Sequence, residues 1–142
     1  MKLRIKGNSI RLRLGQSEVR RLVNEGVVGE FTDFGAFSQQ RFGYALHVTF
    51  DDPNASARFA DGRVIVRVPA GAVRQWAETD QISIRALQPT TDGSELRILI
   101  EKDLECIEPA ADESQEDAFP NPEFSACDSS KPRATALSQA GD

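Results

Sequence analysis

The sequence is short of the residue types on which most catalytic and metal sites are built. Its 142 residues include one His, two Cys, one Trp and one Tyr. His47 has no Cys or Ser at a spacing typical of a catalytic pair, and Cys106 and Cys127 form neither a metal-ligand spacing nor a disulfide framework. P-loop, GxGxxG, HExxH, GxSxG and CxxC motifs are also missing. We therefore expect a protein that is not an enzyme, with no catalytic residue, no metal and no cofactor.

Long apolar runs are missing as well. No stretch reaches the roughly 18 consecutive apolar residues that a membrane-spanning helix needs. The N-terminus carries charges but lacks the apolar segment of a signal peptide. The chain is therefore expected to be cytoplasmic, where thiols are usually reduced, and to make no contact with a membrane.

Charge is distributed unevenly along the chain. The formal net charge of −5 comprises +2 over residues 1–54, −1 over 55–107 and −6 over 108–142. The last of these segments is rich in Pro, Ser, Ala and acidic residues and shows no sustained apolar period, which is typical of disorder. The sequence thus predicts an ordered domain over residues 1–107 and a disordered acidic tail over 108–142.

The ordered region contains an internal repeat with an offset of 54 residues. "IRLRLGQSEVRRLVNEG" aligns with "VIVRVPAGAVRQWAETD", and "FGYALHVTF" aligns with "LRILIEKDL". The same offset, without gaps, places the Gly7-Asn8 turn over Asp61-Gly62, and both dipeptides are strong hairpin signals. This alignment divides the ordered region into two repeats, at about residues 2–52 and 56–107.

Each repeat reads as two strands joined by a tight turn, a short helix, and two further strands. Four strands and one helix cannot bury both faces of a small sheet, but two interleaved copies can enclose one core. We therefore expect a mainly β (α+β) fold, a pseudo-two-fold barrel of two ββαββ repeats with two short helices. Because the duplication replaces the second copy of a homodimer, the chain should be a monomer.

The N-terminal hairpin is strongly basic. Its turn pairs Lys2 with Arg13 and Arg4 with Arg11, so side-chain alternation places these residues on the face opposite the apolar ones. A polyanion or nucleic-acid site is one interpretation, because phosphates are bound by clustered Lys and Arg. Its candidate residues are Lys2, Arg4, Lys6, Arg11, Arg13 and Arg20. The alternative is that carboxylates of the same protein neutralise the face, either in the acidic tail or at Glu30, Asp33 and Glu101.

The acidic tail contains a second candidate site. "EDAFPNPEF", residues 116–124, places aromatic residues and prolines among acidic residues. Such a segment can fold onto a partner's groove. The candidate contact residues are Phe119, Pro120, Pro122 and Phe124, and the partner is either another protein or the chain's own basic face; an ordinary solvated tail is the alternative.

Two resemblances accompany these patterns. "GRVIVRVPAGAVRQWAETDQISI" (residues 62–84), "ELRILIEKD" and "GNSIRLRL" resemble the AbrB/MazE-like swapped-hairpin barrels, which implies a DNA-binding or antitoxin-like role through the basic hairpin. The first repeat departs from that pattern, with Gly15 in place of a Pro and no counterpart of Asp80. From start to tail, "MKLRIKGNSIR", "ED…FPNP" and a late Cys are similar to a small bacterial family of unknown function.

The residues and resemblances together favour binding over catalysis. The leading hypothesis is a non-enzymatic interaction module whose acidic, Phe-bearing tail engages a protein partner. The alternative hypothesis is a nucleic-acid-binding regulator or antitoxin-like protein of the AbrB/MazE kind that uses the basic hairpin.

Overall fold

The structure is a computed structural model that describes residues 1–106 and 114–125. The first half contains β1 (Lys2–Ile5), β2 (Ser9–Leu14), α1 (Gln16–Glu25), β3 (Val27–Asp33), the 3-10 turn η1 (Ser38–Gln40) and β4 (Arg41–Thr49). The second half contains β5 (Ser56–Ala60), β6 (Arg63–Pro69), α2 (Ala70–Glu78), β7 (Ser83–Pro89) and β8 (Glu95–Lys102), and α3 (Pro122–Ser125) follows. Within these residues, no helix has the length and apolarity needed to cross a membrane.

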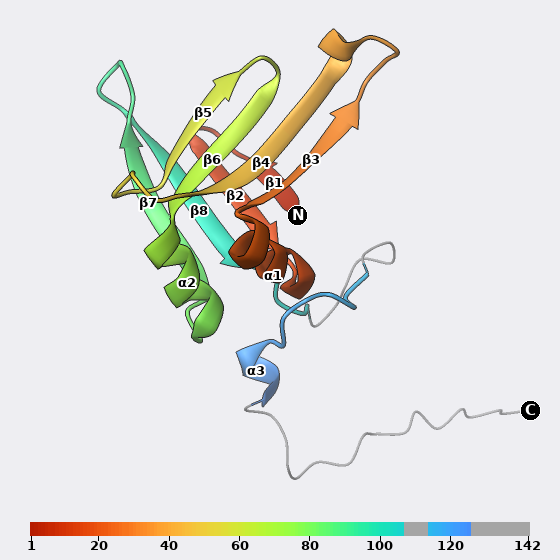
Figure 1. Ribbon diagram of the computed structural model, residues 1–142, viewed down its shortest axis with the longest axis vertical. Helices are drawn as coiled ribbons and strands as arrows, with labels where there is room; N and C mark the ends of the chain where they lie inside the picture. Colours follow the sequence, from red (N-terminus) through yellow and green to blue (C-terminus); the bar gives the residue numbers. More distant parts are fainter. Residues whose placement is uncertain (107–113, 126–142) are drawn as a thin grey trace, which may run out of the picture.

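Two four-stranded sheets face each other, and each takes one hairpin from either half of the chain (Figure 1). Sheet A has the order β1-β2-β8-β7, and sheet B has the order β3-β4-β6-β5. In both sheets the two hairpins meet through a central parallel pair, β2 with β8 and β4 with β6. The predicted mainly β fold with two short helices is confirmed, and the two similar sheets are compatible with the predicted pseudo-two-fold repeat.

One hydrophobic core joins the two sheets and the two helices. Alternate residues of the central strands point inward, among them Leu12 and Leu14 of β2 and Val66 and Val68 of β6. Helices α1 and α2 contact each other at one end of the sheets, where each contributes two buried side chains. Those side chains are Val19 and Leu22 in α1 and Val73 and Trp76 in α2. In each helix the two side chains are three residues apart, so they lie on one face and form an apolar stripe.

The repeat holds at an offset of 54 in most elements but not in all of them. Ser9 pairs with Arg97 in sheet A and Gly43 with Arg63 in sheet B, as the offset of 54 requires. In the outer pairs, however, Ser83 lies opposite Glu101 whereas Val27 lies opposite His47, so β7 and β3 are related by 56 residues. The gap-free alignment is therefore wrong at β3. The reason is that one residue separates α1 from β3 whereas four separate α2 from β7, and α1 is one residue longer than α2.

Part of the predicted tail lies against the domain. We call residues 114–121 the docked segment. This segment lies beside residues 103–105, just after the end of β8, and reaches the start of α1. The Phe119 backbone donates to the Asp103 carbonyl at 2.7 Å and accepts from the Glu105 N–H at 2.8 Å. Ala118 is buried and Phe119 packs against the core. Packing of the described chain therefore does not end at residue 107, because an apolar pair embedded among acidic residues docks where composition alone indicated disorder.

The docked segment also caps α1. Helix α1 starts after Gly15, which has no side chain for capping, and the Ser17 backbone N–H donates instead to Asp117 Oδ1 at 2.9 Å. The Gln16 N–H donates to the Asp117 carbonyl at 2.8 Å. A Cβ atom on Gly15 would lie 2.8 Å from that same carbonyl oxygen. The Gly at position 15, where the second repeat has Pro69, is thus explained by the space that the docked segment occupies.

Asp117→Ala should lower the free energy of unfolding by about 1 kcal/mol near pH 7, the usual effect of replacing a capping Asp by Ala. Hydrogen bonds from Ser17 hold the pKa of Asp117 below its usual value in the folded protein. The stabilisation is therefore present above the pKa of an unfolded Asp, about 4, and is lost as the pH falls through the lower folded value. Denaturant unfolding at neutral and acidic pH should show the gap between variant and wild type closing. Glu116→Ala is the matched control, because the only hydrogen bond of Glu116 in the described chain is made by its backbone N–H. A control with the same pH-dependent loss would contradict the capping role.

Candidate nucleic-acid interface

Most cations of sheet A lie on its outer face, which points away from the core. Residues whose side chains alternate with the buried ones point away from the core on all four strands. The pairing predicted for the N-terminal hairpin is confirmed, with Lys2 opposite Arg13 and Arg4 opposite Arg11. Strands of the second repeat extend this surface. We call it the basic face, and it consists of Lys2, Arg4, Lys6, Arg11, Arg13, Arg85 and Arg97.

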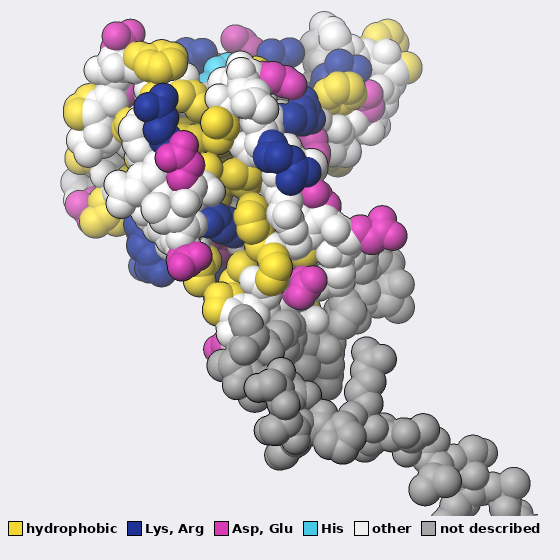
Figure 2. All heavy atoms as spheres, turned by 60° about the horizontal axis from the view of Figure 1, so that its bottom comes forward, with side chains coloured by type: hydrophobic (Ala, Val, Ile, Leu, Met, Phe, Trp, Pro, Cys, Tyr) yellow, Lys and Arg dark blue, Asp and Glu magenta, His cyan; other side chains and the backbone are white. Residues whose placement is uncertain are grey.

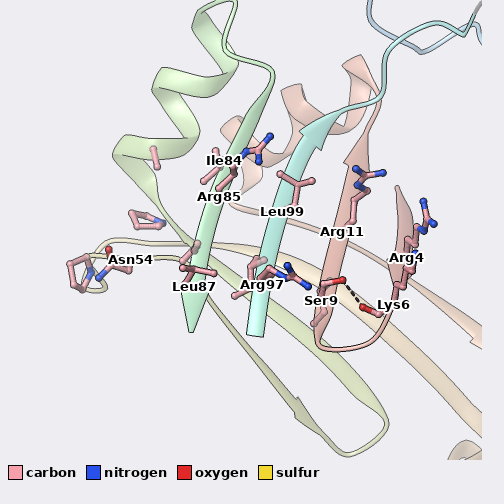
Figure 3. A pocket seen from close by; sticks show the side chains of 17 residues that line it. Arg4, Lys6, Ser9, Arg11, Asn54, Ile84, Arg85, Leu87, Arg97 and Leu99 are labelled. Carbon is pink, nitrogen blue, oxygen red and sulfur yellow. Dashed lines mark hydrogen bonds between the residues drawn. The ribbon is translucent and has the colours of Figure 1, made fainter. Parts of the chain in front are cut away.

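The strand registers align these side chains in rows across the sheet (Figure 3). In one row Arg4 lies opposite Arg11, Arg11 opposite Leu99, and Leu99 opposite Arg85. Figure 3 shows these side chains on strands that lie side by side. Neighbouring strands are about 4.8 Å apart, so the row spans a distance comparable to a few phosphates of a nucleic-acid backbone.

A groove of about 900 Å³ runs over the basic face. Five of its lining residues are basic, and no lining residue is acidic; the cations are Arg4, Lys6, Arg11, Arg85 and Arg97. Leu87 and Leu99 supply apolar surface between them. The connection between β4 and β5 adds Pro53 and Asn54 at the β7 side of the groove. Ten of its seventeen lining residues are apolar, and its five cations favour a ligand with anionic groups over a cationic one.

Among the described residues, acidic side chains pair with the basic face at one end of its strands, near Lys2 and Arg13. Glu101 accepts from Arg13 Nε at 2.8 Å and lies 3.3 Å from Arg11 Nε, and Lys2 Nζ lies 3.0 Å from Asp103. The alternative of internal neutralisation therefore applies to Glu101. It does not apply to Asp33, which pairs with Arg41, or to Glu30, which accepts from the N-terminal ammonium group and from the Tyr44 hydroxyl. Burial and that hydrogen bond to Glu30 raise the pKa of Tyr44.

Four cations of the basic face stay without a carboxylate within 4.0 Å among residues 1–106 and 114–125: Arg4, Lys6, Arg85 and Arg97. Like charges on neighbouring strands repel and cost free energy in the isolated protein. An anionic ligand would remove that repulsion while forming new charge-assisted hydrogen bonds. These four residues are thus the strongest candidates for ligand contact.

Arg85 and Arg97 did not belong to the predicted site, whereas Arg20 did. The hairpin exchange places β7 and β8 of the second repeat beside β2, which brings both residues to the basic face. Pairing the two repeats by their swapped hairpins would have revealed this from the sequence. Arg20 is exposed on α1 and does not line the groove.

The predicted contact residues of the tail lie in two places, the docked segment and α3. Phe119 is half-buried against the core, with Lys102 Nζ 5.4 Å from the centre of its ring. Burial lowers the pKa of Lys102, although nearby Asp80 offsets part of the effect. Pro120 is exposed in the docked segment, and Pro122 and Phe124 belong to α3. The docked segment therefore contacts the end of β8 and the start of α1, not the groove of the basic face.

The other residues that attracted notice in the sequence do not gather into a site. His47 lies on the outer face of sheet B, opposite Val27 and Arg67. Cys106 is a free, exposed thiol, and Cys127 lies outside the described residues. In the part of the chain that the structure describes, no group of three or more His, Cys, Asp or Glu side chains could hold a metal ion.

The basic face contrasts with other parts of the surface. Figure 2 brings the helix end of the molecule forward and shows basic, acidic and hydrophobic side chains interspersed over it.

No curated protein and no solved structure matches the chain. A family model, described as a family of unknown function (DUF7009), matches residues 1–123, which include both sheets and the docked segment. The chain therefore belongs to this family of unknown function.

Proposed function

We propose that the protein is a non-enzymatic nucleic-acid-binding protein whose basic face holds the phosphate backbone. The observation that carries the proposal is the groove of sheet A, which is lined by five cations and no carboxylate although the chain as a whole has a net charge of −5. A single-signed groove concentrates anionic ligands near it despite a net charge of the same sign as the ligand. This is the regulator-like alternative predicted from the basic hairpin, now extended by Arg85 and Arg97.

The tail-mediated interaction with a protein partner is supported less well. Phe119 already packs on its own domain, and Asp117 is used to cap α1. A partner that binds these residues would have to displace them first, at a cost in stability. Contact through Phe124 remains as a proposal, because that residue belongs to α3 and not to the docked segment.

The side chains of the basic face are of the kind that recognises the phosphate backbone of a nucleic acid. Arginine can grip phosphate oxygens through two parallel hydrogen bonds, and Arg4, Arg11, Arg85 and Arg97 supply four such groups over four strands. The groove lining contains no aromatic side chain on which a base could stack. We therefore expect binding that depends strongly on salt and weakly on sequence.

Glu101→Gln should raise the affinity for a short DNA duplex severalfold at low salt. Removing this carboxylate frees Arg11 and Arg13 for phosphates, and each added phosphate contact steepens the salt dependence by about 0.9 in log K against log salt. Fluorescence anisotropy of a labelled duplex over a salt series measures both quantities.

Glu95→Gln is the matched control for that experiment. Glu95 also belongs to β8 and lies on the same face, but its carboxylate makes no ion pair in the described part of the chain. Its loss removes the same formal charge without releasing an arginine, so its effect should be smaller and its salt slope unchanged. A wild-type protein that binds no duplex at about 50 mM salt would overturn the proposed function, since phosphate contacts are favoured there.

A further inference from the structure

The outer face of sheet B differs from the basic face because it carries exposed aromatic rings. On its strands the buried side chains, such as Val28 and Leu46, alternate with side chains that point to solvent. The strand registers place the outward side chains in two central rows: Phe31, Gly43 and Arg63 in one, and Gly29, Ala45, Ile65 and Arg58 in the next. A second groove, of about 650 Å³, lies over these rows, and only Arg58 among the seven does not line it.

Phe31 presents one open ring face to this groove. Its side chain is 60% exposed, and the Arg41 guanidinium lies 4.0 Å from the ring centre, where it covers one face. On the side of Phe31 away from Arg41, the register places Gly29 and Ala45, which have no side chain long enough to cover the other face. Phe37, which is 71% exposed, also lines the groove. A planar ring can therefore stack on Phe31 above a floor of small residues.

The unpaired charges of this face are mostly positive. Arg41 and Arg67 are paired with carboxylates, but Arg58 and Arg63 have none within 4.0 Å among residues 1–106 and 114–125. Asp61 is the one acid of the groove lining that makes no ion pair in that part of the chain. Two free cations against one free acid favour a ligand with anionic groups.

One of these free cations lies beside the open ring. Arg63 leans over Gly43, because a Cβ atom on that glycine would lie 3.3 Å from Arg63 Cγ. Gly43 separates Arg63 from Phe31 in their row, so the two residues are two strand spacings apart, about 10 Å. A phosphate that adjoins a ring stacked on Phe31 is therefore within reach of the guanidinium group.

We propose that the outer face of sheet B binds single-stranded nucleic acid through its bases. One base stacks on Phe31 and another on Phe37, while Arg63 and Arg58 bind the adjoining phosphates. Eight of the seventeen residues that line the groove are polar or charged and three are glycine, which fits sugars and phosphates better than the apolar core of a protein interface. Because the core lies between the two sheets, this face points away from the basic face, and the inference does not rest on the proposed function.

Fluorescence anisotropy of the full chain at about 150 mM salt tests the site, because contacts with the phosphate backbone alone are weakened there. The probe is a labelled DNA strand of about ten nucleotides, and the matched probe has the same phosphates but abasic sites in place of the bases. The wild type should bind the strand with bases at least about 25-fold more tightly, since each of two stacked bases contributes at least about fivefold. Phe31→Ala and Phe37→Ala should each lower that affinity at least about fivefold and leave binding of the abasic strand unchanged.

Phe34→Ala is the matched control, because Phe34 is 74% exposed in the same β3–β4 connection but does not line the groove. Thermal unfolding checks that all the variants fold. Arg63→Gln is a second test that leaves the rings in place: it should reduce the salt slope for the strand by about 0.7, whereas Arg74→Gln on α2 should not change it.

Equal binding of both strands by the wild type, or binding of neither, would overturn the inference. Equal losses in the Phe31 and Phe34 variants would do the same, and so would a mononucleotide that binds as tightly as the strand. Duplex binding at about 50 mM salt is measured in parallel. A wild type that binds the duplex but shows no preference for bases refutes this site alone, whereas the reverse result refutes only the proposed function.

Discussion

Trp76→Ala should lower the free energy of unfolding by about 3–5 kcal/mol, the range for removing a large buried aromatic side chain. Trp76 is fully buried on α2, and its indole N–H donates to the Ile82 carbonyl at 2.8 Å. The substitution opens a cavity under α2 and removes one of the two donors to that carbonyl, which also accepts from the Lys102 N–H at 3.0 Å. Leu22→Ala should cost about 2–5 kcal/mol, because Leu22 fills the equivalent position on α1 and is also fully buried.

Val23→Ala is the control for this pair, since Val23 adjoins Leu22 on α1 but is 47% exposed. Its effect should stay below about 1 kcal/mol, as for most surface substitutions. Urea unfolding followed by tryptophan fluorescence measures Leu22→Ala and the control, and circular dichroism measures Trp76→Ala. Loss of less than about 1 kcal/mol in both buried variants would mean that the two helices do not close a shared core.

The features that sequence reasoning predicted well are those fixed by local spacing. The Gly7-Asn8 turn and the flanking alternation determine the register of β1 with β2, which is confirmed at Lys2–Arg13 and Arg4–Arg11. The short helix predicted in the first repeat is also present, and it ends at Gly26, whose φ of 77° is the left-handed conformation that Gly adopts without strain. Each of these signals lies within a few residues of the chain.

Features that depend on distant residues were harder to predict. Capping of α1 by Asp117 joins positions 100 residues apart, and nothing near Gly15 indicates it. The tail appeared disordered because acidic residues dominate its composition, but the docked segment contacts the domain through Phe119, Ala118, main-chain groups and the Asp117 carboxylate. The two-residue shift of β3 relative to β7 was missed because side chains alternate along a strand, so offsets of 54 and 56 residues place the same side chains on the inner face.

The candidate site shows the same division. Four strands contribute to the basic face, but only β1 and β2 were expected to do so, because the hairpin between them is local. Arg85 and Arg97 arrive through exchange of hairpins between repeats, which the repeat alignment implies only once the strand order is known. The pairing of Arg11 and Arg13 with Glu101 also depends on that parallel contact of β2 with β8.

Replacing Arg4, Arg11, Arg85 and Arg97 together with Gln should lower the affinity for duplex DNA by at least about 100-fold at 50 mM salt. The estimate follows from counterion release, because four lost phosphate contacts remove about 3 to 4 from the slope of log K against log salt, which is a factor of about 100 for a fourfold change in salt. The variant's affinity should accordingly depend much less steeply on salt than that of the wild type, with the remaining dependence due to Lys6 and the other cations that stay on the basic face. Anisotropy titrations with one labelled duplex at several salt concentrations measure both the loss and the slope.

The control removes the same number of charges elsewhere, at Arg20, Arg21, Arg58 and Arg74, none of which lines the groove of sheet A. All four are exposed, so both quadruple variants should fold and carry the same net charge. If binding reflected only overall charge, the two variants would lose affinity equally and the basic face would have no special role. A loss confined to the sheet A variant, with a flattened salt slope, assigns the phosphate contacts to the four strands that the hairpin exchange brings together, because the two variants differ only in which surface loses its cations.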